Sequence, residues 1–263
     1  MEILQDTKFA FNENILENSF FNTDSVLIAG SIYDVFKVKN RKPVFLNQHI
    51  ERVKQSYLLK GFSFEYSDDF IKSQINKVIV ENNIQFGNIK MVFHPLANAV
   101  YIYQIEHHYP TTNDYANGVD TITLNIERPT PNIKQINRQL RLKTEALIKE
   151  NKVYEIILIN HQGYVTEGSK SNLFFIFKDQ IITPPVDSVL PGITRSIVID
   201  ICKKLGFTIT EDKVSASDIV HADAVFITGT SPEVLPVKKV NDFEFKTQSL
   251  ILKWIMMEFS KIE

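Results

Sequence analysis

The residue types that could do covalent chemistry gather in the second half of the chain. Lys134 stands in residues 132–137 (NIKQIN), and Glu167 follows 33 residues later, in residues 163–172 (GYVTEGSKSN). An amine that is buried beside a positive charge has a lowered pKa, so it can be neutral and nucleophilic near pH 7. A glutamate set in an otherwise apolar hairpin must be paired, because an unpaired buried carboxylate is costly. The two side chains therefore suit a reaction that uses a lysine amine and a buried anion.

A third segment, residues 190–195 (LPGITR), has the features of an anion site. Gly192 allows a ligand to approach the backbone closely, and the amides of Ile193 and Thr194 would open a helix. Unsatisfied amides and the helix dipole make a helix N-terminus a ready site for phosphate. A nucleotide-binding loop is a poorer interpretation of the glycine pattern. That loop requires a lysine directly after its second glycine, and Ser169 stands there instead.

Each of these residues has an ordinary explanation when it is taken alone. Lys134 could be a surface lysine of an amphipathic helix, as Lys143 and Lys149 are expected to be. Gly192 could belong to a plain turn, and Cys202 is expected to be a small buried apolar side chain. The histidines form no H-E-x-x-H and a single cysteine allows no multi-cysteine site, so no metal site is predicted. The functional interpretation rests on the segments in combination.

The elements that must position these residues can be predicted from hydrophobic periodicity and turn residues. In the first half, a helix is expected from a cap at Asn47 to a stop at Gly61, and a second helix starts at Ser67. Residues 109–118 are polar, turn-rich and aperiodic, and we interpret them as a linker between two domains. Strands of the first half are expected at 26–39, 43–46, 88–93 and 99–106.

The second half is also expected to alternate between strands and helices. Helices are expected at about 133–150, from Thr194 to Leu205, near 216–221 with a cap at Ser215 or Ser217, and at about 245–260. Strands are expected at 119–127, 154–160, 163–168, 172–177, 180–183, 207–213 and 223–228. The predicted fold class is therefore α+β.

Composition and charge narrow the class of protein. The chain has 263 residues, of which 44% are hydrophobic and 23% charged, enough to build a sizeable core. A net charge of −2 provides no basic field for a nucleic acid or an acidic membrane, and no apolar run reaches about 18 residues. Residues 1–6 lack the basic and apolar regions of a signal peptide. We expect a cytoplasmic enzyme or binding protein with a small-molecule ligand and no nucleic-acid or membrane partner.

Four segments together resemble the class IV aminotransferases, the fold-type-IV enzymes that use pyridoxal 5′-phosphate (PLP). They occur in the order and roughly the spacing of that family, and they are residues 132–137, 163–174, 190–195 and 228–237. The family includes branched-chain aminotransferases, D-amino acid aminotransferases and 4-amino-4-deoxychorismate lyases. The resemblance covers essentially the whole chain, most strongly from 130 to 240.

The resemblance implies a two-domain α+β architecture with the cofactor in the interdomain cleft. On this interpretation residues 1–108 form a small N-terminal domain, 109–118 the linker, and 119–263 a larger PLP-binding domain. A homodimer is also implied, in which the partner subunit completes the pocket.

The resemblance also implies roles for single residues. Lys134 resembles the lysine that forms a Schiff base with PLP and then carries a proton between substrate and cofactor. Glu167 resembles the carboxylate that keeps the pyridine nitrogen protonated and so makes the ring an electron sink. Arg52, in residues 49–56 (HIERVKQS), matches an arginine that reaches the phosphate. The other residues implied at the cofactor are Gly192, Ile193, Thr194, Gly229 and Thr230.

Departures from the family pattern concern the substrate more than the cofactor. Members often carry a Gly-Asp-Gly or similar tight element where this chain has residues 30–34 (GSIYD). The loop that often supplies an arginine for a substrate carboxylate is replaced by the short segment 93–98 (FHPLAN). The candidate substrate contacts are Tyr33, His94 and Ser231.

Three functions are compatible with these residues. The first is an aminotransferase that moves an amino group between an amino acid and a 2-oxo acid. The second is an aminodeoxychorismate lyase, which would use the same Lys134 to eliminate pyruvate from an amino-chorismate substrate and release 4-aminobenzoate. The third, motivated by the two altered segments, is a catalytically silent PLP-binding protein. The substrate side chain and its D or L handedness do not follow from the sequence.

Overall fold

Helices and strands together account for most of the structure, which confirms the α+β class. A computed structural model describes residues 7–106 and 108–262 of the chain. The expectation about residues 1–6 therefore lies outside the described residues. Within the described ranges, no helix has both the length and the apolar character that a membrane crossing would need.

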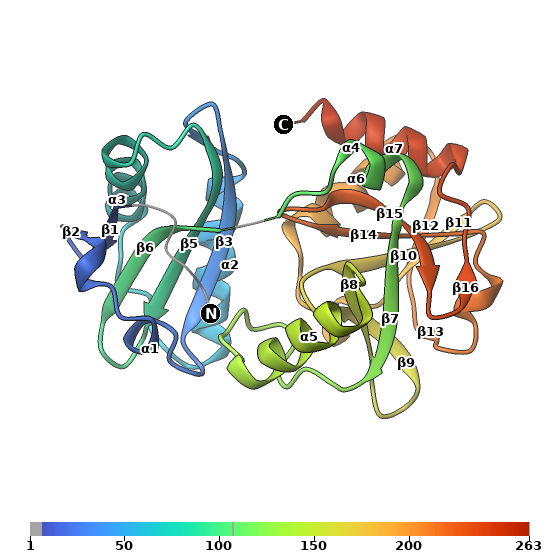
Figure 1. Cartoon of the computed structure of the whole chain (residues 1–263), viewed down its shortest axis with the longest axis horizontal. Coiled ribbons are helices and arrows are strands. Elements are labelled where there is room, and N and C mark those ends of the chain that lie inside the picture. The colour runs from blue at the N-terminus through green and yellow to red at the C-terminus, as the bar shows by residue number, and fades with distance from the viewer. Residues whose placement is uncertain (1–6, 107, 263) are drawn as a thin grey trace. The chain divides into compact units, whose positions relative to one another are not determined.

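The chain forms two compact units that alternate along the sequence (Figure 1). Unit 1 comprises Met1–His108 and Ile133–Arg138, and unit 2 comprises Tyr109–Asn132 and Gln139–Glu263. The short segment that carries Lys134 therefore belongs to unit 1, although both of its neighbours along the chain belong to unit 2.

Unit 1 is built on a six-stranded sheet with the order β2-β1-β6-β5-β3-β4. All of the neighbouring strands pair antiparallel. The strands are β1 (Lys8–Phe11), β2 (Asn14–Glu17), β3 (Ile32–Lys39), β4 (Lys42–Pro43), β5 (Phe86–His94) and β6 (Ala99–Ile105). Because β4 pairs only with Val38 and Lys39, the first part of β3 is left available for another segment.

Two longer helices, α2 (Leu46–Leu59) and α3 (Asp68–Glu81), contribute to the core of this unit. The helix α3 begins as predicted, because the Ser67 side chain accepts a hydrogen bond from the Phe70 amide. Asp68 and Asp69 lie in its first turn, where the helix dipole favours anions. The remaining helical pieces of unit 1 are η1 (Asn18–Phe20) and α1 (Thr23–Val26).

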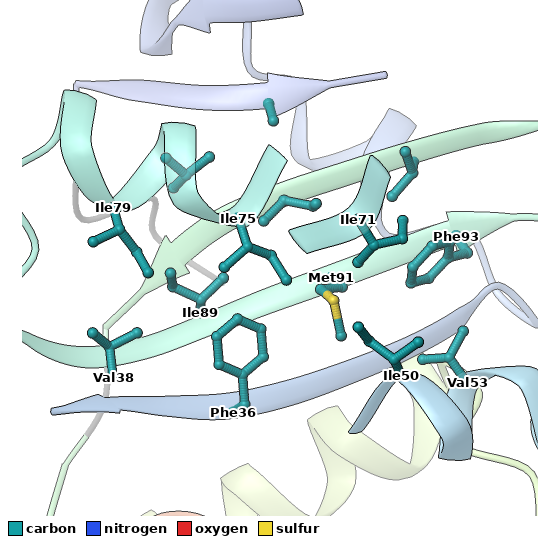
Figure 2. Close-up of a cluster of buried hydrophobic side chains, with 14 of the residues drawn as sticks. Phe36, Val38, Ile50, Val53, Ile71, Ile75, Ile79, Ile89, Met91 and Phe93 are labelled. Carbon is teal, nitrogen blue, oxygen red and sulfur yellow. The ribbon is translucent and has the colours of Figure 1, made fainter. Parts of the chain in front are cut away.

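The core of unit 1 is a layer of aliphatic and aromatic side chains on one face of the sheet. Figure 2 shows Ile71, Ile75 and Ile79 of α3 directed toward Ile89 and Met91 of β5. Positions 71, 75 and 79 are spaced by four residues, so they form one stripe of the helix. Burying each such side chain contributes roughly 1.5–3 kcal/mol, so this layer contributes strongly to the stability of the unit.

Unit 2 is built on a ten-stranded mixed sheet with the order β12-β11-β10-β14-β15-β7-β8-β9-β13, in which β16 pairs with β15. The pairs β11–β12, β15–β7 and β7–β8 are parallel, and the others are antiparallel. The strands are β7 (Val119–Asn125), β8 (Glu155–Ile159), β9 (Tyr164–Gly168), β10 (Asn172–Phe177), β11 (Gln180–Thr183), β12 (Thr208–Glu211), β13 (Val214–Ser215), β14 (Ala224–Gly229), β15 (Glu233–Val240) and β16 (Phe243–Glu244).

The helical segments of unit 2 include α6, whose N-terminus belongs to the candidate site. They are α4 (Thr112–Asn117), α5 (Arg138–Asn151), η2 (Val186–Ser188), α6 (Ile193–Lys204), η3 (Ile219–His221) and α7 (Leu250–Ser260). The strands β10 and β14 bury Phe174 and Phe226 as a stacked pair with ring centroids 4.8 Å apart. The central strands of the sheet are buried on both faces, which explains their nearly continuous apolar sequences.

Several predicted boundaries of unit 1 are wrong, and each has a local cause. Residues 23–26 form the short helix α1, capped by the Asn22 side chain, so the strand predicted at 26–39 begins only at Ile32. The strand predicted at 43–46 is reduced to β4 because α2 begins at Leu46. Its N-cap is Phe45 in a left-handed conformation, and the cap predicted at Asn47 is wrong. The strands β1 and β2 were not predicted.

Three predictions in unit 2 also need correction. The supposed linker contains α4, which is stabilised by a capping box between Thr111 and Asp114. The helix predicted near 216–221 is the 3₁₀ turn η3, with Asp218 rather than a serine at its N-cap. The strand β15 was not predicted, and within it Pro236 lies opposite Phe226 of β14.

The helix predicted over 133–150 begins at Arg138, and residues 133–137 before it are not helical. The Ile136 amide donates to the Ser31 carbonyl at 2.8 Å, and the Tyr33 amide donates to the Lys134 carbonyl at 2.9 Å. Gln135 also forms an isolated antiparallel bridge with Ile32. The segment therefore uses its backbone to pair with the start of β3, which is incompatible with the predicted helix.

Replacing Ile75 with alanine should destabilise the protein by about 2–5 kcal/mol, because it removes buried methyl groups and leaves a cavity between α3 and the sheet. Val80→Ala on the same helix is the matched control, since Val80 is 60% exposed, and it should change stability by less than about 0.5 kcal/mol. Urea unfolding of both variants measures the difference. Equal effects would show that the α3 stripe is not the main core contact.

Candidate active site

One face of α2 carries a stripe of polar side chains that continues past the helix end. His49, Arg52, Ser56 and Lys60 are separated by three, four and four residues, so they lie along one side of the helix axis. An ordinary amphipathic helix would turn such residues to water, but His49 and Ser56 are buried. His49 and Arg52 contact Asp34, Ser56 contacts the Lys134 backbone, and Lys60 contacts the Gln135 side chain.

The first contact of this stripe is with the carboxylate of Asp34. Asp34 is fully buried, and its Oδ1 accepts hydrogen bonds from His49 Nδ1 at 2.9 Å and Arg52 Nη2 at 2.6 Å. Its Oδ2 accepts from Arg52 Nε at 2.8 Å. The Val35 amide adds a fourth donor at 2.7 Å. Burial would raise the pKa of Asp34, but the charge of Arg52 and the His49 hydrogen bond outweigh it and hold that pKa well below its usual range.

The same network determines the protonation state of His49. Burial lowers the pKa of His49, and the positive charges of Arg52 and Lys134 act in the same direction, against the opposing effect of Asp34. His49 is therefore a neutral imidazole near pH 7 whose Nδ1–H donates to Asp34.

Lys134 is fixed to unit 1 through its backbone and its side chain. Its amide donates to Ser56 Oγ at 3.2 Å, and Ser56 Oγ donates in turn to the Arg52 carbonyl at 2.9 Å. The Lys134 Nζ lies 5.0 Å from the ring centroid of Tyr33, and Lys90 Nζ lies 4.8 Å from the same ring. Both distances are those of cation–π contacts. The tyrosine ring therefore defines where the amine of Lys134 rests.

The last residue of the stripe holds the chain next to Lys134. Lys60 Nζ donates to the Gly30 carbonyl and, at 2.8 Å, to Gln135 Oε1. Burial lowers the pKa of Lys60. The polar stripe of α2 and its C-cap Lys60 thus contact Lys134, Gln135 and the turn at Gly30 before β3.

In unit 2, Glu167 is buried and paired. Its side chain accepts from Arg128 Nε at 2.6 Å and from the Leu190 amide at 3.1 Å, and Arg128 also donates to the Ser169 carbonyl at 3.1 Å. Charge-assisted bonds of this length stabilise the ionised carboxylate. Arg128 was not singled out from the sequence, where it is one arginine before a proline.

A second buried carboxylate, Glu155, shapes the turn after Glu167. Glu155 accepts from the backbone amides of Ser169 and Lys170 and from the hydroxyls of Ser169 and Ser171, at 2.6–3.2 Å. The serine-rich turn 168–171 is thus wrapped around one anion of the chain, which explains why this glycine- and serine-rich loop does not need a bound phosphate. Glu155 was also missed from the sequence, although a glutamate at the start of the apolar run 155–159 was a signal.

The predicted anion site is the N-terminus of α6. Gly192 is its N-cap and offers no side chain to the first-turn amides, which have no acceptor within the helix. A Cβ on Gly192 would lie 2.0 Å from Asn172 Oδ1, so only glycine fits there. Asn172 Nδ2 donates to the Leu190 carbonyl at 2.9 Å and so ties this turn to the start of β10.

The β14–β15 turn lies beside this helix end through its pairing with β10. Asn172 pairs with Thr228 across the two strands, and Gly229 pairs with Glu233 at the turn. Thr228 Oγ1 is buried and, among the described residues, has no hydrogen-bond partner. Thr230 and Ser231 at the tip of the turn are half-buried.

The structure therefore gathers the predicted residues in two groups, one in each unit. In unit 1, Arg52, Tyr33 and Lys134 lie in one network. In unit 2, one group of neighbouring segments contains Glu167, Gly192, Ile193, Thr194, Gly229 and Thr230. His94, a candidate substrate contact, is buried and donates from Nε2 to the Val26 carbonyl at 2.9 Å, which is a structural bond within unit 1.

No three metal-ligand side chains come together among the residues that the structure describes. In unit 1 the polar groups are the Lys134 amine and an arginine paired with a carboxylate. In unit 2 they are a second arginine–carboxylate pair and the helix-terminal amides of α6. A lysine amine suits carbonyl chemistry, and helix-terminal amides suit an anion.

Comparison with known proteins identifies the family. Residues 31–240 match the family model of amino-transferase class IV. A D-alanine aminotransferase of Bacillus licheniformis is 28% identical over 251 residues, covering 89% of this chain and 88% of that protein. A probable branched-chain-amino-acid aminotransferase of Thermotoga maritima is 29% identical over 236 residues, covering 83% and 80%. The chain belongs to the class IV aminotransferase family and is an enzyme of that family.

Solved structures share the fold across the branches of this family. The structure of a putative 4-amino-4-deoxychorismate lyase from Legionella pneumophila superposes with a TM-score of 0.82 at 24% identity, covering 92% of this chain and 95% of that one. Because this structure, named as a lyase, shares the fold of the aminotransferases, the fold alone does not select the reaction.

Gly192→Ala should destabilise the protein by about 1–3 kcal/mol, because the added methyl group collides with Asn172 while the backbone conformation itself suits alanine. Asn172→Ala alone should cost about 1 kcal/mol for the lost hydrogen bond to Leu190. In the double variant the collision is gone, so the combined cost should be smaller than the two single costs added together. Additive costs in urea unfolding would show that the contact is absent.

Stability without added cofactor should fall at acidic pH because of His49. The unfolded histidine binds a proton near pH 6.5, whereas the folded one, with its lowered pKa, stays neutral to a lower pH. In that window the unfolded state binds more protons, and stability decreases by up to about 1.4 kcal/mol per pH unit as the pH falls. His49→Gln should reduce this loss between pH 7.5 and 5.5 in denaturant unfolding. An unchanged pH dependence in the variant would contradict the assignment.

Proposed function

We propose that the protein is a PLP-dependent aminotransferase that moves an amino group between an amino acid and a 2-oxo acid. The observation that carries this proposal is the segment from Leu190 to Gly192. At the start of this segment, the Leu190 amide donates to the buried Glu167 carboxylate. At its end, Gly192 is the N-cap of α6 and leaves the first-turn amides without a side-chain acceptor. Two residues of chain span at most about 7 Å, so an acid and an anion site lie within reach of one small ligand.

The residues present fit this coenzyme. A ligand with a protonated ring nitrogen and a phosphate needs an anion and a cradle of amides, and Glu167 and the α6 terminus supply them. The buried, unpartnered hydroxyl of Thr228 and the glycine that a methyl group would block both lie at this cradle. Arg128 Nε and the Leu190 amide donate to Glu167, and donors of this kind keep a buried carboxylate ionised.

We assign roles to these side chains accordingly. When bound, the coenzyme supplies the electron sink that lets a Cα–H bond of the substrate break. Lys134 carries the coenzyme covalently and afterwards moves a proton as general base and acid. Arg128 keeps Glu167 ionised and oriented, and Arg52 contributes a charged donor to the phosphate. The remaining proposed phosphate-site residues are Gly192, Ile193, Thr194, Gly229 and Thr230.

Two residues are proposed as contacts of the substrate. Tyr33, whose ring rests against the Lys134 amine, and Ser231, at the tip of the β14–β15 turn, are suitable neighbours for an amino acid. The names of the relatives include D-alanine and branched-chain amino acids, so both classes of donor should be tried. We also expect the active protein to be a homodimer, as the family resemblance implies.

The test is cofactor attachment followed by a half-reaction. Purified protein mixed with PLP should develop a visible absorption band, and borohydride should fix the coenzyme on the peptide that contains Lys134. Lys134→Ala should abolish both, while Lys143→Ala, an exposed lysine of α5, should leave both unchanged. Attachment at another lysine, or a protein that stays colourless with PLP, would refute the proposal.

A donor panel then separates the aminotransferase from its alternatives. The band should bleach with at least one D- or L-amino acid and return when a 2-oxo acid is added. Release of pyruvate from aminodeoxychorismate with no oxo-acid acceptor would assign the lyase instead. Attachment without a response to any donor would indicate a silent family member.

A further inference from the structure

Asp34 is a charged residue in the middle of an apolar stripe. On β3, Ile32, Phe36 and Val38 are core residues, and Asp34 shares their side of the strand because side chains alternate along it. A leucine or valine would be the simplest occupant of such a position. Buried ion pairs seldom stabilise a protein more than apolar residues of the same size would. The presence of a carboxylate here therefore calls for an explanation other than stability.

The geometry of the carboxylate supplies one. Arg52 turns one whole edge of its guanidinium, Nε and Nη2, toward the two oxygens of Asp34, at 2.8 and 2.6 Å. Two parallel bonds fix the plane of the guanidinium as well as its position. Because the group is planar and rigid, the direction of its opposite edge is then fixed too. His49 holds the same carboxylate from a third direction, at 2.9 Å.

The network has few ways to relax. Asp34 is fully buried, His49 is 3% exposed, and α2, which carries both His49 and Arg52, is packed on the core through Ile50 and Val53. Asp34 is thus held by strand β3, and Arg52 is held by a helix that is packed on the core. This is the construction expected for a residue that aims another residue.

We propose that Asp34, supported by His49, is a positioning residue that aims Arg52 at the phosphate of the coenzyme. The inference rests on the proposed function, which assigns Arg52 to that phosphate, and it goes beyond it by naming the residue that sets the direction of the arginine. Asp34 itself touches neither the coenzyme nor the substrate in this account.

The test compares two ligands that differ only in the phosphate. The dissociation constants of PLP and of pyridoxal, which lacks the phosphate, are measured by absorption for the wild type and for Asp34→Asn. Asparagine keeps the shape of the side chain and removes its charge. The Kd of PLP should rise about 10- to 100-fold, by analogy with the loss of residues that orient metal ligands, while that of pyridoxal changes less than about threefold. A structural role alone would weaken both ligands equally and would overturn the proposal.

A second background checks that the effect passes through the arginine. In Arg52→Gln protein, PLP binding should already be weakened, and adding Asp34→Asn should change it less than about twofold, because no arginine is left to aim. An undiminished effect of Asp34→Asn in this background would also overturn the proposal.

If Asp34→Asn does not fold, His49→Gln replaces it as the test, because this variant leaves the Asp34–Arg52 ion pair in place. His49→Gln should raise the Kd of PLP by a smaller factor and leave the Kd of pyridoxal unchanged. An unchanged ratio of the two Kd values would count against the inference. If the wild type itself binds PLP no better than pyridoxal, the proposed phosphate site fails, and the inference fails with it.

Discussion

A carboxylate withdrawn from water must be given other donors, and both units are arranged around this constraint. Asp34, Glu155 and Glu167 are each at most 2% exposed, and each is surrounded by amides, hydroxyls or an arginine. Such groups are costly when unpaired and rigid when paired. In unit 1 the buried acid orients an arginine, and in unit 2 one acid shapes a turn while the other presents a negative charge beside a helix terminus. The apolar cores hold these networks still.

How much of this follows from the sequence depends on how local the information is. The start of α3 and the limits of α6 are determined by residues within a few positions, such as Ser67 and Gly206, and they were predicted within one residue. The sequence around Lys134 predicts a helix because its own residues are compatible with one. In the structure the backbone of Gln135 instead pairs with Ile32 of β3, about a hundred residues earlier in the chain.

The candidate site shows the same division. Lys134, Glu167 and Gly192 are singled out because their types and order match a known chemistry, and their roles stay predictions. Arg128 and Glu155 were missed, since nothing in a single sequence tells which arginine faces which acid. The Asp34 network was missed for a similar reason: the sequence shows an acid in a strand but not that α2 lies over it. Candidate reacting groups can thus be proposed from residue type and order, whereas the groups that hold them in place follow only from the fold.

The alternation of the two units along the chain has a consequence for biosynthesis. Residues 7–106 emerge from the ribosome before residues 133–136, the segment that borders β3 and bonds to Ser56 and Lys60. Until that stretch is translated, the edge of β3 and the polar side of α2 lack their intended neighbours. At ordinary elongation rates of about 5–20 residues per second, the wait is on the order of a few seconds. During that interval a nascent chain exposes an open sheet edge, the kind of surface that chaperones cover.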